Sequence, residues 1–286
     1  MACVNKDKCL NPLDNDCSES GKICFNTVGS FNCQTPTPPS LRKSTIALIQ
    51  LRSASTDFTI STSPQSQSLD WILSNPSCFD GVKDDILVQR FALVTLYFST
   101  IGTEWKKDML DCDTDSEEKA IDFSTFGSGT SGLIPIEIGL LTQLTSLVMA
   151  GTKAEQSTIG GSLPSELGLL TQLTLLSIRF NDLTGSLPSE FGLMSNLTAV
   201  KLRGNRLSGS LPTQFGLLNQ LTLLRLFNNE LTGLIPTELG LLSQLEILNF
   251  KRNDKLTGNI PSSLCDIPKI NIDCVKITCS CDQCRC

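Results

Sequence analysis

A repeat of 24 residues dominates the sequence between Gly161 and Pro261. Its clearest copy, GSLPSELGLLTQLTLLSIRFNDLT, runs from Gly161 to Thr184 and recurs with small changes three more times. A column of prolines keeps the register with steps of 29, 24, 24, 24 and 25 residues, at Pro135, Pro164, Pro188, Pro212, Pro236 and Pro261. A fixed period of this length predicts a solenoid, in which each repeat is one supersecondary unit stacked on its neighbours.

Alternating apolar residues in each repeat predict one short strand with a buried face. The buried pairs are Leu176 and Ile178, Val200 and Leu202, Leu224 and Leu226, and Leu248 and Phe250. An Asn follows each strand, and its amide is predicted to pair with buried backbone groups of the turn, at Asn181, Asn205, Asn229 and Asn253. One repeat buries about seven aliphatic side chains at roughly 2 kcal/mol each. Because ordering costs about 1.5 kcal/mol per residue, a single repeat cannot fold, and a capped stack is expected.

The repeat resembles the plant-type leucine-rich repeat. The pattern LxxLxxLxLxxNxLxGxLP is carried by Leu170, Leu173, Leu176, Ile178, Asn181, Leu183, Gly185, Leu187 and Pro188, and the resemblance covers Leu141 to Pro261. It implies an α/β solenoid, an arc with a parallel sheet on its concave side, between residues 123 and 261. It also implies a recognition scaffold rather than an enzyme.

Composition excludes several functions. Histidine is absent from all 286 residues, which removes the commonest catalytic base and metal ligand. We therefore expect no enzymatic activity. A net charge of −6 and a pI near 4.8 argue against a nucleic-acid partner.

The cysteines point to an oxidising compartment. Eleven of the 13 lie at the two ends, in Cys3–Cys33 and Cys265–Cys286. Disulfide-stapled ends are expected of a protein that is secreted or on the extracellular side of the plasma membrane. No apolar signal segment follows Met1, and the longest apolar run, residues 86–98, is too short to span a bilayer. We interpret the chain as a fragment whose signal peptide, and an anchor if there is one, lie outside it.

Residues 1–34 resemble a truncated calcium-binding epidermal growth factor-like module, through CFNTVGSFNC between Cys24 and Cys33. The resemblance implies the disulfides Cys9–Cys24 and Cys17–Cys33, and the calcium ligands Asn5, Asp7 and Asn26. Lys8 departs from the family, because a cation there repels Ca²⁺. Two alternatives stay open for this module: a weak calcium site, or a stapled spacer.

Residues 35–66 are rich in Pro, Ser and Thr and are predicted to be a linker or stalk, with one strand near residues 46–51. Two helices are predicted next, at residues 67–73 and 84–101, within a helical N-terminal cap over residues 67–122. One stripe on the second helix is predicted to cover the first repeat, at Leu87, Phe91, Val94, Phe98 and Ile101. The segments SPQSQSLDWIL and QRFALVTLYFSTIGTEW resemble the helical N-cap of plant-type repeat proteins, especially the form seen in diatom leucine-rich repeat proteins. Cys78 and Cys112 are expected to pair there.

Residues 262–286 are predicted to form a Cys-rich C-terminal cap with a disulfide between Cys265 and Cys274. The closing CSCDQCRC, with Cys279, Cys281, Cys284 and Cys286, has two interpretations: a four-thiolate zinc site, or disulfides within the cap. The missing histidines favour disulfides.

Residues between and just after the buried strand positions are expected to face solvent on the concave side. Six of them are cationic and none is anionic. The predicted ligand-binding residues are Arg179, Phe180, Lys201, Arg203, Arg225, Phe227, Lys251 and Arg252. Acids are expected on the convex side, at Glu137, Glu166, Glu190 and Glu238. Because neighbouring strands lie about 4.8 Å apart, stacked like charges repel. A sheet face that keeps them is expected to bind an anionic partner. The alternative is an ordinary solvated surface with no ligand.

The leading hypothesis is an extracellular recognition module whose basic concave face binds a protein or an anionic polysaccharide. The alternatives are a structural matrix or cell-wall protein, and the ectodomain of a receptor kinase whose enzymatic domain is absent here. Asn196, in Asn-Leu-Thr, is the only N-glycosylation sequon. It is expected on a convex turn; its alternative is an ordinary turn Asn. The sequence predicts no oligomeric state.

Overall fold

The computed structural model describes residues 23–27, 30–34, 45–47, 49–50, 58, 62–74, 84–100, 131–149, 158–273, 276–279, 281–282 and 284–285. The chain forms two compact units. Unit 1 comprises Met1–Phe98 and Lys106–Glu117, and unit 2 comprises Ser99–Trp105 and Glu118–Cys286.

Unit 1 contains an antiparallel hairpin of β1 (Ile23–Thr27) and β2 (Ser30–Gln34), with Cys24 in register with Cys33. The predicted ligands Asn5 and Asp7 and the side chain of Asn26 lie outside the described part of the chain. So does at least one cysteine of each predicted pair Cys9–Cys24, Cys17–Cys33 and Cys78–Cys112. These assignments stay predictions.

The predicted strand near residues 46–51 is wrong, because residues 45–47 and 49–50 are helical. Ile46 and Ile49 have the spacing of one helix face, and Ile49 is fully buried. A short apolar run does not distinguish helix from strand, so β-branched composition misled the assignment.

Both predicted helices are present, as α2 (Pro64–Leu73) and α3 (Asp84–Thr100). Ser63 caps α2 by accepting the Ser66 N–H at 3.1 Å, and Pro64 occupies the first turn, where its missing N–H costs nothing. The predicted stripe on α3 underestimates its burial. Every residue from Phe91 to Leu96 is buried, which is the pattern of a helix covered on all sides.

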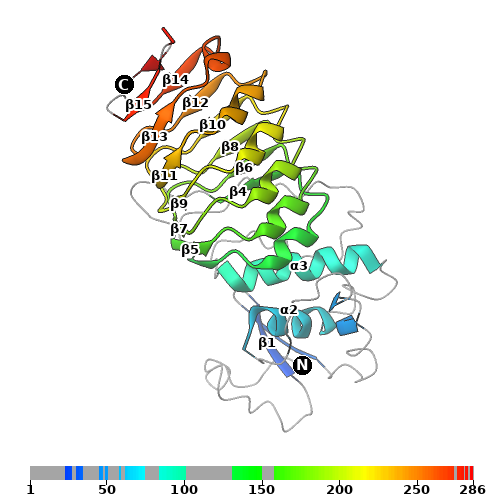
Figure 1. The fold of residues 1–286 in the computed structure, drawn as a ribbon. Helices are drawn as coiled ribbons and strands as arrows, with labels where there is room; N and C mark the ends of the chain where they lie inside the picture. The colour runs from blue at the N-terminus through cyan, green and yellow to red at the C-terminus, as the bar shows by residue number, and fades with distance from the viewer. Residues whose placement is uncertain are drawn as a thin grey trace. The chain divides into compact units, whose positions relative to one another are not determined.

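Unit 2 is a stack of repeats held by a parallel sheet of seven strands, here the long sheet (Figure 1). Its strands follow chain order: β4 (Ser146–Val148), β6 (Leu175–Ser177), β8 (Ala199–Lys201), β10 (Leu223–Arg225), β12 (Ile247–Asn249), β14 (Lys269–Asn271) and β16 (Cys284–Arg285). Leu176, Val200, Leu224 and Leu248 are fully buried beneath it. The predicted solenoid with one strand per repeat in a parallel sheet is confirmed.

Each repeat also carries a second, lateral strand that the sequence analysis missed. β3 (Ser131–Leu133), β5 (Thr158–Ser162) and β7 (Asp182–Thr184) form one parallel sheet. β9 (Ser208–Gly209), β11 (Glu230–Leu234), β13 (Lys255–Asn259) and β15 (Ile277–Thr278) form another. The repeat therefore has three sides: the long sheet, the lateral strands and a 3-10 helix.

The 3-10 helices begin directly after the proline column. They are η5 (Ile136–Leu140), η6 (Ser165–Leu169), η7 (Ser189–Leu193), η8 (Thr213–Leu217), η9 (Thr237–Leu241) and η10 (Ser262–Leu264). Proline fixes φ, at −63° for Pro188 and −64° for Pro212, and so sets the corner where each helix starts.

A glycine in each of the helices η5 to η9 lets neighbouring repeats approach closely. A Cβ on Gly192 would lie 2.6 Å from the carbonyl oxygen of Gln214 in the next repeat. Substituting Gly192 by Ala should therefore force η7 and η8 apart and lower the free energy of unfolding by about 1–3 kcal/mol, the usual cost of overpacking. Urea unfolding followed by circular dichroism measures this. The exposed Ser195→Ala change is the control, and equal stability of the two variants would refute the close-approach argument.

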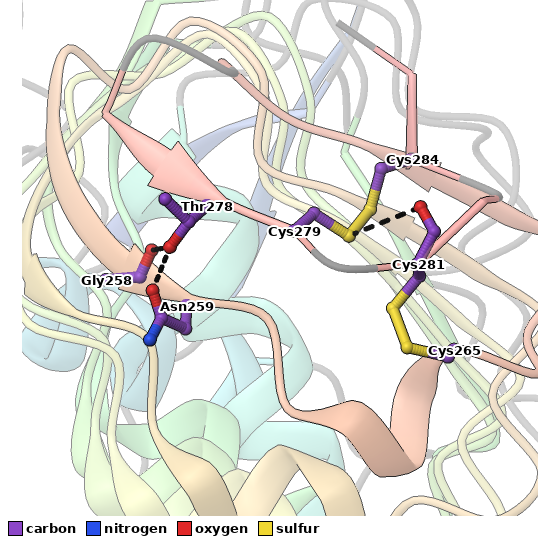
Figure 2. Close-up of a disulfide and its surroundings, with 7 residues drawn as sticks. All are labelled: Gly258, Asn259, Cys265, Thr278, Cys279, Cys281 and Cys284. Atoms are coloured by element: carbon purple, nitrogen blue, oxygen red, sulfur yellow. Dashed lines mark hydrogen bonds between the residues drawn. A yellow bond between two sulfur atoms is a disulfide. The ribbon is translucent and has the colours of Figure 1, made fainter.

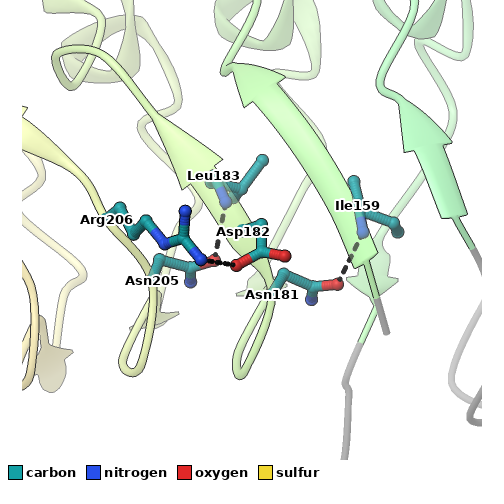
Figure 3. Close-up of polar contacts among 6 residues, drawn as sticks. All are labelled: Ile159, Asn181, Asp182, Leu183, Asn205 and Arg206. Carbon is teal, nitrogen blue, oxygen red and sulfur yellow. Dashed lines mark hydrogen bonds and ion pairs between the residues drawn. The ribbon is translucent and has the colours of Figure 1, made fainter. Parts of the chain in front are cut away.

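The turn asparagines do what the sequence predicts (Figure 3). The Asn205 Oδ1 accepts the Leu183 N–H at 3.2 Å, and its Nδ2 donates to the carbonyls of Ile178 at 2.8 Å and Leu202 at 3.0 Å. Asn181 likewise accepts the Ile159 N–H at 3.3 Å. Asn181, Asn205, Asn229 and Asn253 are all buried. This ladder satisfies backbone groups of neighbouring repeats.

Among the described residues of the C-terminal cap, Cys265 is bonded to Cys281 and Cys279 to Cys284 (Figure 2). The predicted Cys265–Cys274 pair is therefore wrong. After η10 the chain passes through β14 and β15, which brings Cys281 within a Cα–Cα distance of 4.9 Å from Cys265. Cys274 is nearer to Cys265 in the sequence, but the fold places Cys281 beside it. Because these four sulfurs are bonded in pairs, the structure favours the disulfide interpretation over the zinc site.

Candidate functional site

The predicted ligand-binding residues lie at or just after the ends of β6, β8, β10 and β12. Parallel register pairs Lys201 with Arg225 on adjacent strands. Arg203 lies two residues after Lys201, and Arg179 occupies the equivalent position of the preceding repeat. These two repeats are joined by the Phe180 N–H, which donates to the Arg203 carbonyl at 3.0 Å. The structure thus brings four cations together on three successive repeats. We call Arg179, Lys201, Arg203 and Arg225 the basic cluster.

Neighbouring cations contribute to lowering the pKa values of two members of the basic cluster, Lys201 and Arg203. The pKa of Lys201 is lowered by burial, and further by the charges of Arg225, Arg179 and Arg203. The pKa of Arg203 is lowered by burial and by Arg179 and Arg225. No carboxylate is among the causes of either shift. The four cations are therefore held together at an electrostatic cost.

Two phenyl rings hold the Arg203 guanidinium. Its central carbon lies 4.9 Å from the ring centroid of Phe180 and 5.4 Å from that of Phe227. Both distances are within the range of a cation–π interaction. The rings restrict the rotamers of Arg203, so its N–H groups are presented in a fixed orientation.

Gly204, which the ligand-binding prediction left out, adjoins the Phe180 ring. A Cβ at this position would lie 2.6 Å from the Phe180 ring, so only glycine leaves room for the ring. Phe180 itself has a φ of 56°, in the left-handed region, which costs on the order of 1 kcal/mol or more for a bulky residue. The sequence carried one signal for this contact: Gly204 occupies the repeat position that Phe180, Asn228 and Arg252 occupy in the other repeats.

Two guanidinium nitrogens in the basic cluster lack acceptors. Among the described residues, the Nε atoms of Arg179 and Arg203 are buried and have no hydrogen-bond partner. A buried donor without a partner costs about 1–3 kcal/mol. An acceptor brought by a ligand would recover that cost.

The remaining predicted residues contribute differently. Lys251 and Arg252 follow β12, one repeat beyond Phe227, and cause neither of the pKa shifts in the basic cluster. Ser177, expected to face solvent, is only 3% exposed, because its short side chain does not reach past its neighbours. The acids expected on the convex side all lie in the first turns of 3-10 helices, at Glu137, Glu166, Glu190 and Glu238. Glu137 differs from the other three in being fully buried.

Comparison with known proteins identifies the repeat. Residues 172–194 and 220–242 match the family model described as Leucine Rich Repeat. The stack is a leucine-rich repeat solenoid. A search of curated proteins gave no match. Among the helices that the structure describes, none is long and apolar enough to cross a membrane.

Solved structures with leucine-rich repeats resemble parts of this solenoid. The ectodomain of the plant membrane receptor kinase GASSHO1/SCHENGEN3 from Arabidopsis thaliana, in complex with CASPARIAN STRIP INTEGRITY FACTOR 2, is 36% identical over 52% of this chain and 17% of its own, with a TM-score of 0.47. A TDR receptor is 37% identical over 52% of this chain and 24% of its own, with a TM-score of 0.45. The ectodomain of the receptor kinase SOBIR1 from Arabidopsis thaliana is 28% identical over 44% and 66%, with a TM-score of 0.41. The match spans at most about a quarter of the first two proteins.

Proposed function

We propose that the chain is an extracellular recognition module whose basic cluster binds an acidic protein or peptide. The observation that carries this proposal is the concentration of four cations on three repeats, with two buried Nε atoms that lack acceptors. Two unit charges about 4.8 Å apart repel by nearly 1 kcal/mol even in water. Carboxylates from a partner would offset this repulsion.

The boundaries of the basic cluster favour a compact protein epitope over a long polyanion. In the register of the long sheet, Lys201 and Arg225 are flanked by the uncharged Ser177 and Asn249. A polysaccharide with regularly spaced charges would be matched by cations along every strand. The rings of Phe180 and Phe227 beside Arg203 add the aromatic–arginine combination that is enriched at protein interfaces.

An extracellular location is supported by the C-terminal cap, whose disulfides Cys265–Cys281 and Cys279–Cys284 form in oxidising compartments. The epidermal growth factor-like interpretation of residues 1–34, its calcium site and the likeness to diatom proteins remain predictions from the sequence. The matrix-protein alternative differs in needing no ligand on the long sheet.

A binding assay with two anionic probes tests the proposal. The probes are a fluorescent peptide of alternating Glu and Leu, and a heparin oligosaccharide of equal charge. We expect the chain to bind the peptide at low salt and more weakly at physiological salt, because exposed charges are screened over about 8 Å at 0.15 M. Binding of heparin but not of the peptide would indicate that the partner is a polysaccharide and not a protein. Binding of neither probe at low salt would overturn the proposed function.

A further inference from the structure

The 3-10 helices lie on a different side of each repeat from the long sheet (Figure 1). Four of them end in an exposed leucine. Each leucine is the last residue of its helix and exposes more than half of its surface: Leu169 53%, Leu193 58%, Leu217 55% and Leu241 63%. We call these four residues the outer leucine row. Large apolar side chains exposed at the same position of successive repeats are the kind of surface that marks an interaction site.

The residue next to this row differs in one repeat only. After each 3-10 helix comes a turn with Gln-Leu, at Gln143, Gln172, Gln220 and Gln244, and Thr follows in all but the last. Asn196 replaces Gln in the third of these five turns and is followed by Leu197 and Thr198. This one shorter amide turns the repeated Gln-Leu-Thr into the acceptor sequence for N-glycosylation.

The Asn196 amide lies in the turn after η7 and points to the same turn of the preceding repeat. Asn196 is exposed, three residues after Leu193, and its Nδ2 donates to the Thr171 carbonyl of the preceding repeat at 2.9 Å. Thr171 is two residues after Leu169. The atom that would bear a sugar therefore bridges the turns that follow η6 and η7, the helices that end at Leu169 and Leu193. A glycosylated Nδ2 keeps one hydrogen, so the bond to Thr171 can persist.

We propose that Asn196 carries an N-linked glycan that covers the outer leucine row around Leu169, Leu193 and Leu217. The inference rests on the extracellular location in the proposed function. A lipid diphosphate-linked oligosaccharide of the secretory pathway is the donor. The bond from the sugar C1 to the diphosphate breaks, C1 bonds to Nδ2, Nδ2 loses one proton and the lipid diphosphate leaves. The glycan would not obstruct the basic cluster, which lies on the long-sheet side.

Occupancy is tested by secreting the chain from a eukaryotic host and measuring its mass before and after an endoglycosidase. We expect a loss of mass for the wild type and none for Asn196→Gln. This variant should fold, because Gln is the residue at the same position of other repeats. Gln220→Asn combined with Asn196→Gln moves the sequon one repeat along and should restore the glycan. Modification of that variant but not of the wild type would overturn the inference.

Coverage is tested by hydroxyl-radical footprinting of the folded wild type against Asn196→Gln. Because a glycan is bulky, we expect oxidation of Leu193 to be roughly twofold slower in the glycosylated protein. Leu234, which is 69% exposed on lateral strand β11, should react equally in both. Equal oxidation of Leu193, or association through this row in both proteins, would refute coverage.

The proposed binding function and the proposed glycan can be rejected independently of each other. The acidic peptide should bind Asn196→Gln and wild type alike, because the sequon precedes β8, whereas the basic cluster lies at or after the C-terminal ends of the strands. Unmodified Asn196 in material whose Cys265–Cys281 disulfide is intact would reject the glycan and leave the binding proposal standing.

Discussion

Replacing Asn205 by Ala should lower the free energy of unfolding by about 3–5 kcal/mol, because its buried amide makes three hydrogen bonds to backbone groups. Without it, the Leu183 N–H and the carbonyls of Ile178 and Leu202 lose their partner inside the stack. Each buried group left unpaired costs about 1–3 kcal/mol. Nearest-neighbour coupling carries the loss to adjacent repeats, so urea unfolding should also become less cooperative.

The matched control is Asn219→Ala, an exposed turn asparagine of the following repeat. We expect its stability to stay within about 0.5 kcal/mol of wild type, as for most surface substitutions. A loss of less than about 1 kcal/mol for Asn205→Ala would show that water or relaxed backbone satisfies the same groups.

Reversing two cations of the basic cluster should weaken binding of the acidic peptide roughly 100-fold, or about 3 kcal/mol. The variant is Arg203→Glu with Arg225→Glu, which changes the formal charge of the cluster from four positive charges to zero. The variant also removes the guanidinium from between Phe180 and Phe227. Surface plasmon resonance at low and physiological salt measures both rates. We expect the association rate of the variant to fall and to lose its salt dependence.

A charge-matched control reverses two cations outside the long sheet, through Arg206→Glu and Lys255→Glu. Arg206 pairs with Asp182 at 3.0 Å at the lateral strands, and both side chains are substantially exposed (Figure 3). Breaking this pair should cost less than about 1 kcal/mol. If both double variants lose affinity equally, net charge rather than the basic cluster governs binding.

The features predicted from the sequence are those that repeat. Leu176, Val200, Leu224 and Leu248 recur at a fixed spacing, so their burial follows from periodicity alone. The lateral strands were not predicted from the sequence, because glycines interrupt their alternating pattern. Gly161 and Gly209 lie in β5 and β9 with φ of 71° and 75°, a conformation that strand patterns do not anticipate.

The details of the binding site could not be predicted from spacing, because they depend on side-chain conformation. Periodicity placed Arg203, Phe180 and Phe227 on one face, but it did not show that both rings contact one guanidinium. The partner of Cys265 is decided by how the chain folds back after η10. Neither the ring contacts nor the disulfide recurs, so no column of the repeat encodes them.

The most direct test of the central claim is zero-length coupling of the acidic peptide to the chain with a carbodiimide, mapped by mass spectrometry. The reagent joins a partner carboxylate to a lysine amine in contact with it. Burial and the neighbouring arginines lower the pKa of Lys201, so more of its amine is neutral and nucleophilic at a given pH. Lys255, Lys269 and Lys276 are more exposed than Lys201, and exposure alone would favour them. We predict coupling at Lys201; coupling confined to Lys255, Lys269 and Lys276 would contradict binding at the basic cluster.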